Sequence, residues 1–554
     1  MTPLPDDILV LIFSFLTQNA LLKCRCLSRA TEYLATSLAF RHVRLELFCD
    51  PLPFVRIAES SKLRPLVREI TIDAWQGPTP DGHDVRGYIV RRTTKFLLAL
   101  PLVRLLSGLQ AVNIKFTQSG ASVDTIRQLA MLSTIVKCVT GRWTEELHET
   151  WQKSWLDWFM NRMTLYSADN ESHSVSGGEF TDLVRPFTPV GQLLSLSSLT
   201  IANLTENTEH ALYESPEFQE LLSAQFLKEL KLLVATRRSQ YDLSEQIFLP
   251  EKYDFFDNLP KTWLSPVICS NLRVLSLYCR EYFGWAPKLD VRMLGLGNGT
   301  SPFPNLRVLA LGNYVFSHEW QIDWIASLGA DNGRGGLEEL YLDDCPIMWR
   351  AHVLGPMDES ILDVNGVQIA NTGYPLKEVM TRQSPHDERW DPVTVKFHLR
   401  WSTVLDIWRN KMKTLKVFRM GSGDWEGKHT VTVATARTMD LTGDLGSKLK
   451  AQPAWKRRCE DVVHINYDKR SMAEFLQHNE SNLALQHGLG LSQSRESVLQ
   501  YVHFHVGLGW VERDFGRDMM DGSENGWQLY EASRKADEEA LRQLLEAVDC
   551  HPRK

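Results

Sequence analysis

The sequence predicts an α/β fold with three parts: a small helical domain (residues 1–46), an irregular solenoid of strand-helix repeats (47–420) and a C-terminal capping region (421–554). Two observations carry this prediction. A strongly apolar helical segment lies close to the N-terminus, and a short leucine pattern recurs behind it with helical segments between its copies. With 554 residues, 43% of them hydrophobic, the chain can bury large cores.

The first helix is expected to begin near Asp6. A Leu-Pro dipeptide precedes Asp6 and Asp7, whose carboxylates suit the first turn of a helix, where the backbone amides are unpaired and the helix dipole is positive. Every residue from Ile8 to Leu16 except Ser14 is apolar, so the helix has no polar side. A small domain cannot bury such a helix on all sides, so we expect a partner to cover it.

Further short helices are expected behind a turn at Thr17 to Asn19, because leucines recur there among basic residues. Together with the final segment Phe40 to Leu45, the order of these features resembles the F-box, especially its fungal forms. In that family the motif binds a Skp-type adaptor, which links it to a cullin and a RING subunit. The resemblance assigns adaptor-facing or core roles to Leu4, Pro5, Ile8, Leu9, Ile12, Leu16, Leu21, Leu22 and Leu27. The residues alone leave open that these helices only cap the repeats.

The pattern Leu-x-x-Leu-x-Leu recurs through the body of the chain. Its apolar positions alternate as in a half-buried strand, and a helical segment such as Trp320 to Leu328 follows, ended by glycines. The clear copies, which begin at Leu272, Leu306 and Leu337, start 34 and 31 residues apart. Weaker copies begin at Val67, Leu109, Leu196, Leu227 and Leu415.

We interpret this pattern as an irregular leucine-rich-repeat solenoid with insertions near residues 167–179 and 355–392. Stacked repeats of this kind present a parallel sheet on a concave face, which commonly binds proteins. An ordinary α/β domain with leucine-rich strands remains the alternative. The last part, residues 494–548, contains strand-like and helical segments that we expect to cap the open end of the array.

Side chains between the leucines are predicted to lie on the concave face, because successive side chains of a strand alternate. Glu69, Thr71, Asp73 and Ser276 belong to this set. An aromatic and acidic group within it would suit a basic peptide, although a solvated strand face is also simply polar. The candidate substrate-binding residues are Tyr278, Glu339, Tyr341, Asp343, Asp344 and Arg419.

The sequence predicts no catalytic residue, no metal site and no cofactor. The glycine cluster at 295–299 lacks the lysine and serine of a P-loop, and His503 with His505, like His386 with Glu388, lacks an identifiable third metal ligand.

The nine cysteines show no CxxC pair, which indicates reduced thiols. A net charge of -7 argues against nucleic acid as the main partner. We expect neither a membrane span nor a signal peptide, and therefore cytoplasmic or nuclear residence.

These observations favour a non-catalytic substrate-recognition subunit of an SCF-type (cullin-RING) ubiquitin ligase. In this hypothesis the F-box binds the Skp-type adaptor and the repeats bind a protein substrate, which raises the local concentration of substrate near the ubiquitin-loaded E2. One alternative is a leucine-rich-repeat interaction scaffold that is not linked to ubiquitination. Another is a fused enzyme with its active site in residues 421–554.

Overall fold

The computed structural model divides the chain into two compact units. The first contains residues 1–117, 126–201 and 214–221, and the second contains 118–125, 202–213 and 222–554. The predicted boundaries at residues 46 and 420 thus fall inside units, and the three-part division stays a prediction. The structure describes residues 5–47, 49–74, 85–116, 122–167, 180–189, 193–206, 210–235, 250–294, 302–362, 368–370, 373–381, 391–421, 425, 489, 499–505, 509–513 and 525–549.

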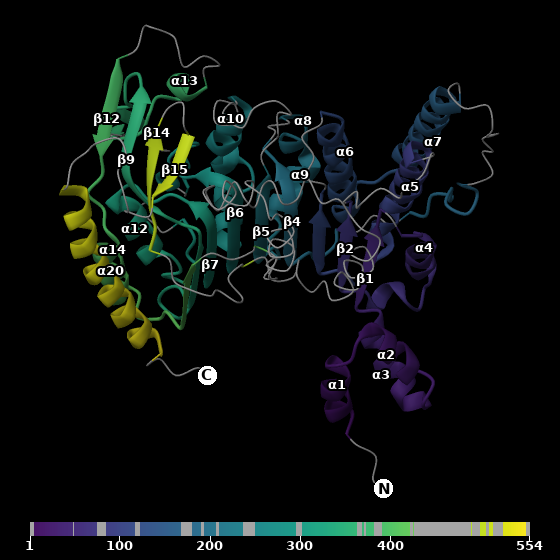
Figure 1. Ribbon diagram of the computed structural model, residues 1–554. Coiled ribbons are helices and arrows are strands. Elements are labelled where there is room, and N and C mark those ends of the chain that lie inside the picture. The colour runs from purple at the N-terminus through teal and green to yellow at the C-terminus, as the bar shows by residue number, and fades with distance from the viewer. Residues whose placement is uncertain are drawn as a thin grey trace, which may run out of the picture. The chain divides into compact units, whose positions relative to one another are not determined.

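Three short helices open the first unit: α1 (Asp6–Ser14), α2 (Gln18–Cys24) and α3 (Arg29–Ala39) (Figure 1). The predicted start at Asp6 is confirmed, with Asp6 and Asp7 in the first turn. The Thr17 hydroxyl caps α2 by accepting from the Ala20 amide at 3.3 Å, and Ser28 forms a capping box with Thr31 at the start of α3. The small core contains Phe13, Leu21, Ala35 and Ala39.

A parallel sheet follows directly. Strands β1 (His42–Glu46), β2 (Glu69–Asp73) and β3 (Ala111–Lys115) pair in order, and β4 (Ser198–Thr205) lies next to β3. Val43, Ile70 and Val112 align across this sheet and are buried. Among the residues that the structure describes here, the other helices are α4 (Leu52–Glu59), α5 (Val85–Ala99), α6 (Ser122–Val139), α7 (Glu145–Ser167), α8 (His210–Tyr213) and α9 (Pro216–Ser223), with 3-10 turns at Arg64–Leu66 and Leu100–Leu105.

The second unit continues the strand-helix alternation. Its parallel strands pair in the order β5 (Glu229–Ala235), β6 (Val274–Phe283), β7 (Val308–Tyr314), β8 (Glu339–Asp343) and β13 (Val417–Gly421). Helix α12 (Glu319–Ser327) confirms the helix expected between the copies at 306 and 337. Among the described residues, the other helices between these strands are α10 (Pro250–Asn258), α11 (Pro266–Asn271), α13 (Lys377–Met380) and α14 (Trp401–Lys411), with 3-10 turns at Leu259–Lys261 and Val291–Met293.

Equivalent positions of the leucine pattern align from strand to strand. In the second unit the fourth position of each copy forms one buried row: Leu230, Leu275, Leu309, Leu340 and Phe418. The sixth position forms a second buried row beside the first: Leu232, Leu277, Leu311, Leu342 and Met420. Each copy of the pattern is therefore a strand whose leucines enter the core, as the period-two alternation predicts.

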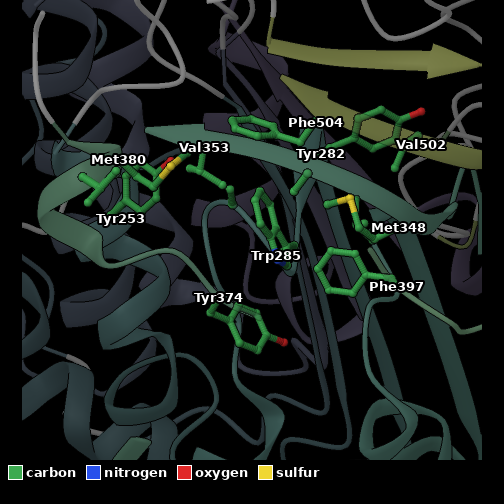
Figure 2. Close-up of a cluster of buried hydrophobic side chains, with 14 residues drawn as sticks. Tyr253, Tyr282, Trp285, Met348, Val353, Tyr374, Met380, Phe397, Val502 and Phe504 are labelled. Carbon is green, nitrogen blue, oxygen red and sulfur yellow. The ribbon is translucent and has the colours of Figure 1, made fainter. Parts of the chain in front are cut away.

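A second sheet lies in the second unit, in the order β12 (Pro392–Lys396), β9 (Ile347–Leu354), β14 (Tyr501–His505) and β15 (Gly509–Arg513). Its aromatic core is built around Trp285, Tyr282, Phe397 and Phe504 (Figure 2). The expected insertion at 355–392 is not only a loop, because it holds the hairpin β10 (Ser360–Leu362) with β11 (Gln368–Ala370) and helix α13 (Lys377–Met380). Of the insertion at 167–179, residues 168–179 lie outside the described residues.

The C-terminal region contributes a strand to the second sheet and a helix beside α14. Strand β14 pairs with β9 in parallel, so residues far apart in sequence form one sheet. Helix α20 (Asn525–Asp549) runs alongside α14, as Figure 1 shows. Among the described residues, no helix combines the length and the hydropathy needed to cross a membrane.

Candidate protein-interaction surfaces

The three N-terminal helices expose an apolar surface. Phe13 points into their small core, which leaves the other faces of the apolar helix α1 uncovered. Phe15 is 81% exposed, Leu27 72% and Tyr33 74%, values unusual for large apolar side chains. We call this the apolar patch; its members are Ile8, Val10, Leu11, Ile12, Phe15, Leu22, Leu27 and Tyr33.

The sequence predicted half of this patch. Of the predicted residues, Pro5, Ile8, Ile12, Leu22 and Leu27 are exposed. Leu9 and Leu16 are half-buried, Leu21 is buried in the core of the domain, and Leu4 lies outside the described residues.

Val10, Leu11, Phe15 and Tyr33 are members of the patch that the residue-by-residue comparison with the family missed. A helical signal for Phe15 was present, because Ile8, Ile12 and Phe15 are spaced i, i+4 and i+7. Phe15, the C-cap residue directly after α1, therefore lies on the side of the helix that carries Ile8 and Ile12.

The second surface is the face of the parallel sheet opposite the leucine rows. Across β6, β7, β8 and β13, Ser276, Ala310, Tyr341 and Arg419 align in register. The neighbouring row carries Tyr278, whose ring lies over Gly312 of the next strand. A Cβ at Gly312 would stand 2.1 Å from that ring, so only glycine fits.

This face is covered by the chain itself. Trp425 is 3% exposed and donates its indole N–H to the Ser276 hydroxyl at 3.2 Å. The Tyr278 hydroxyl donates to the main-chain carbonyl of Leu489 at 2.7 Å. The buried cluster on this face, hereafter the face cluster, comprises Ala202, Leu233, Tyr278, Ala310, Tyr341 and Trp425.

The predicted accessibility of most substrate-binding candidates is therefore wrong. Tyr278 and Tyr341 are buried beneath this cover, and Asp343 and Asp344 are buried as well. Arg419 is exposed, and Glu339 is half-buried. The sequence pattern assigned the correct sheet face to the tyrosines but gave no sign that a distant residue of the same chain lies on it.

Tyr341 and Glu339 interact directly. The Tyr341 hydroxyl donates to the Glu339 carboxylate at 2.6 Å, and burial together with this carboxylate raises the pKa of Tyr341. The hydroxyl therefore stays protonated at neutral pH.

The predicted concave-face residues of the first unit are also engaged within the fold. Thr71 is buried, with its hydroxyl 2.9 Å from His42 Nε2. Glu69 accepts a hydrogen bond from the Asn113 amide at 2.5 Å, and Asp73 is half-buried. Thr71 and Glu69 thus have hydrogen-bond partners on neighbouring strands, which is the usual state of polar groups at a buried strand face.

A buried ion pair lies elsewhere in the second unit. Lys252 of α10 and Glu281 of β6 contact each other away from water. Burial opposes the charge of Lys252, but Glu281 and Glu206 outweigh it and raise the pKa of that ammonium group. Lys252 therefore holds its proton and does not offer a free amine.

Histidines gather on the second sheet. Beside His503 and His505 of β14 lies His352 of β9, with ring centroids 4.9 and 5.4 Å from theirs. His352 is thus a third imidazole beside the pair, which the sequence did not reveal. The Nδ1 atom of His352 lies 2.6 Å from Thr394 Oγ1. In the part of the chain that the structure describes, no group of three or more His, Cys, Asp or Glu side chains is arranged to hold a metal ion. The segments 295–299 and 386–388 lie outside it.

The thiols of the described cysteines are free. Burial raises the pKa of Cys138 and of Cys279 to about 12, so both remain neutral thiols at physiological pH. Burial and the neighbouring Glu46 carboxylate raise the pKa of Cys49 to about 12 as well.

Comparison with known families agrees with the geometry of the N-terminal helices. Residues 2–42 match the family described as F-box domain. No curated protein matches the chain. F-box domains in general bind Skp-type adaptors, and F-box proteins in general are non-catalytic subunits that bring substrates to SCF ligases. Since the matched residues form the helices that carry the apolar patch, the chain has an F-box domain at its N-terminus.

Proposed function

We propose that this chain is the substrate-recognition subunit of an SCF-type (cullin-RING) ubiquitin ligase. The observation that carries the proposal is the coincidence of the F-box match at residues 2–42 with an uncovered apolar patch on the same helices. In this role the patch binds the Skp-type adaptor, the adaptor recruits cullin and RING subunits, and the rest of the chain holds a protein substrate. Cytosolic or nuclear residence belongs to the same proposal.

The patch has the composition of a protein-binding site. Aromatic side chains dominate binding hot spots because they bury a large area with few rotatable bonds, and Phe15 and Tyr33 supply two of them. At about 25 cal/mol per Å² of apolar surface, covering several large side chains stabilises a complex substantially. Ile8, Ile12, Leu22 and Leu27 add exposed aliphatic area on the same three-helix domain.

We also propose that the body is an irregular leucine-rich-repeat array. The aligned leucine rows support this, and so does a second regularity at the eighth position of three copies. Asn203, Asn313 and Asp344 occupy this position, and each has a positive φ, of 60°, 61° and 48° respectively. Recurrence of one rare backbone state at one motif position is expected of a repeat, since equivalent positions of successive copies adopt the same conformation.

The substrate is proposed to bind on the sheet face of the second unit. Arg419 is exposed there, with Tyr341 in the same row and Glu339 in the adjacent row. A surface with one cation beside one carboxylate selects its partner through charge complementarity more than through total area.

Affinity purification from cells with the proteasome blocked tests the proposal. The wild-type chain should recover the adaptor, a cullin and substrate proteins. Ile8→Asp should recover the substrate proteins alone, because adaptor binding would have to bury the aspartate charge. Recovery of the same partners by both variants, without adaptor or cullin, would favour an interaction scaffold outside the ubiquitin pathway.

A further inference from the structure

The face cluster forms a binding site for one flat aromatic side chain. Its floor consists of the small side chains Ser276 and Ala310, which are register partners on β6 and β7. Tyr278 and Tyr341 belong to the same cluster: Tyr341 is the register partner of Ala310 on β8, and Tyr278 lies two residues after Ser276 on β6. Strands β6 to β8 thus offer a shallow apolar site with one hydroxyl at its base.

This site is separate from the leucine core. The leucines of each strand point to one side of the sheet, and Ser276, Ala310 and Tyr341 alternate with them and point to the other. Filling the site is therefore not required to complete the leucine rows.

The chain's own Trp425 occupies the site. Its indole is buried, and its N–H donates to the Ser276 hydroxyl at 3.2 Å, so the occupant combines a flat apolar ring with one donor. Leu489 packs beside it and accepts a hydrogen bond from Tyr278 through its main-chain carbonyl at 2.7 Å. The resident side chain defines the ligand chemistry that the site accepts.

Trp425 is held close to the site by a short connection. It lies four residues after Gly421, the last residue of β13, the strand that pairs with β8. A tether this short gives the indole a high effective concentration, on the order of millimolar or above, at the site. An external ligand must then compete with an intramolecular one.

We propose that the face cluster is a recognition site for an aromatic side chain, that Trp425 occupies it in cis, and that a substrate segment with a tryptophan or similar N–H-bearing aromatic residue binds by displacing Trp425. This inference rests on the proposed function, because it identifies the substrate chemistry of the same sheet face. While Trp425 occupies the site, weak aromatic ligands cannot bind there. A ligand that makes further contacts, for example with Arg419, can displace Trp425.

A labelled synthetic peptide provides the test. The probe is a nine-residue peptide with the sequence of residues 421–429, GSGDWEGKH, and its binding to the full chain is followed by fluorescence anisotropy. Trp425→Ala should bind the probe at least roughly tenfold more tightly than the wild type, because the cis competitor is gone. The same probe with alanine in place of tryptophan should not bind.

Further variants separate recognition from simple cavity filling or misfolding. Ala310→Leu in the Trp425→Ala background should abolish probe binding by filling the floor of the site, and Ser276→Ala should weaken it by removing the acceptor. Trp425→Phe keeps a ring in place without the N–H donor, and should give intermediate probe affinity. Trp349→Ala, which changes a half-buried tryptophan of β9 outside the cluster, should bind the probe no better than the wild type.

Two results would overturn the inference: equal probe affinity for wild type and folded Trp425→Phe and Trp425→Ala, or tighter binding that survives Ala310→Leu. If Trp425→Ala does not fold, Trp425→Phe alone decides between these outcomes. Adaptor binding is measured on the same samples. If the wild type does not bind the adaptor, the proposed function is contradicted but the inference about the aromatic site is not. If adaptor binding is normal and Trp425→Ala gains no probe affinity, only the inference about the aromatic site is contradicted.

Discussion

The side-chain amide of Asn313 donates a 2.7 Å hydrogen bond to the buried main-chain carbonyl of Cys279, which holds the equivalent position in the preceding copy of the leucine pattern. The two residues are 34 apart in sequence, the spacing of the two copies. Asn313 has a φ of 61°, a conformation that asparagine tolerates better than most residues. Asn313 therefore links two strands through its side chain and has a rare backbone conformation near the end of β7.

Asn313→Ala should lower the free energy of unfolding by about 2–3 kcal/mol, because it leaves a buried carbonyl without this donor and because alanine tolerates a positive φ less well than asparagine. Asn313→Gly should cost less, since glycine adopts that φ freely. Urea denaturation measures both. The matched control is Asn305→Ala, which removes an exposed amide-to-carbonyl hydrogen bond to Ser270. Equal losses for Asn305→Ala and Asn313→Ala would show that the link between copies contributes nothing special.

The C-terminal helix is predicted to unfold together with the rest of its unit. The Tyr501 hydroxyl of β14 donates to the Asp537 carboxylate of α20 at 2.6 Å and accepts from the Trp401 amide at 3.0 Å. Tyr501→Phe leaves both groups without that partner in a buried place, so it should cost about 1–3 kcal/mol. Tyr33→Phe, at an exposed position, should cost nothing measurable. Loss of α20 alone, in a separate early transition, would indicate an independent module.

Stability should fall in acid partly through Glu338. A hydrogen bond from Lys416, assisted by Arg307 and Arg334, holds the pKa of Glu338 below its ordinary value of 4.5. A lowered carboxyl pKa stabilises the native state above the unfolded-state pKa, and this contribution is lost as the pH falls through the native one. Between pH 7 and pH 3 the wild type should therefore lose more stability than Glu338→Gln, by up to about 1 kcal/mol. Parallel pH profiles would contradict the assignment.

The strands of the body were predictable from the sequence, because each copy of the leucine pattern has its own local alternation. Leu275, Leu309 and Leu340 appear in register in the structure as three equivalent positions of the pattern. The first helix was predictable for a similar reason, since Asp6 and Asp7 mark its start and a continuous apolar run follows.

The cover over the sheet face was not predictable. The contact of Tyr278 with Leu489 joins residues 211 apart, and nothing local to either marks it. The pairing of β14 with β9 is equally distant in sequence, so a region read as an end cap proved to supply an interior strand of the second sheet. Local patterns determine which side of a strand faces the core, but they do not determine what lies on the other side.

Direct binding to a purified Skp-type adaptor, measured by biolayer interferometry, tests the central claim. The wild-type chain should bind, and Phe15→Asp should weaken binding by roughly 100-fold or more, since the complex would have to desolvate a charge at the most exposed aromatic residue of the apolar patch. Val267→Asp places the same charge on an exposed apolar position of α11, outside the patch, and should bind like the wild type. A wild-type chain that does not bind, or equal losses in Phe15→Asp and Val267→Asp, would contradict the account.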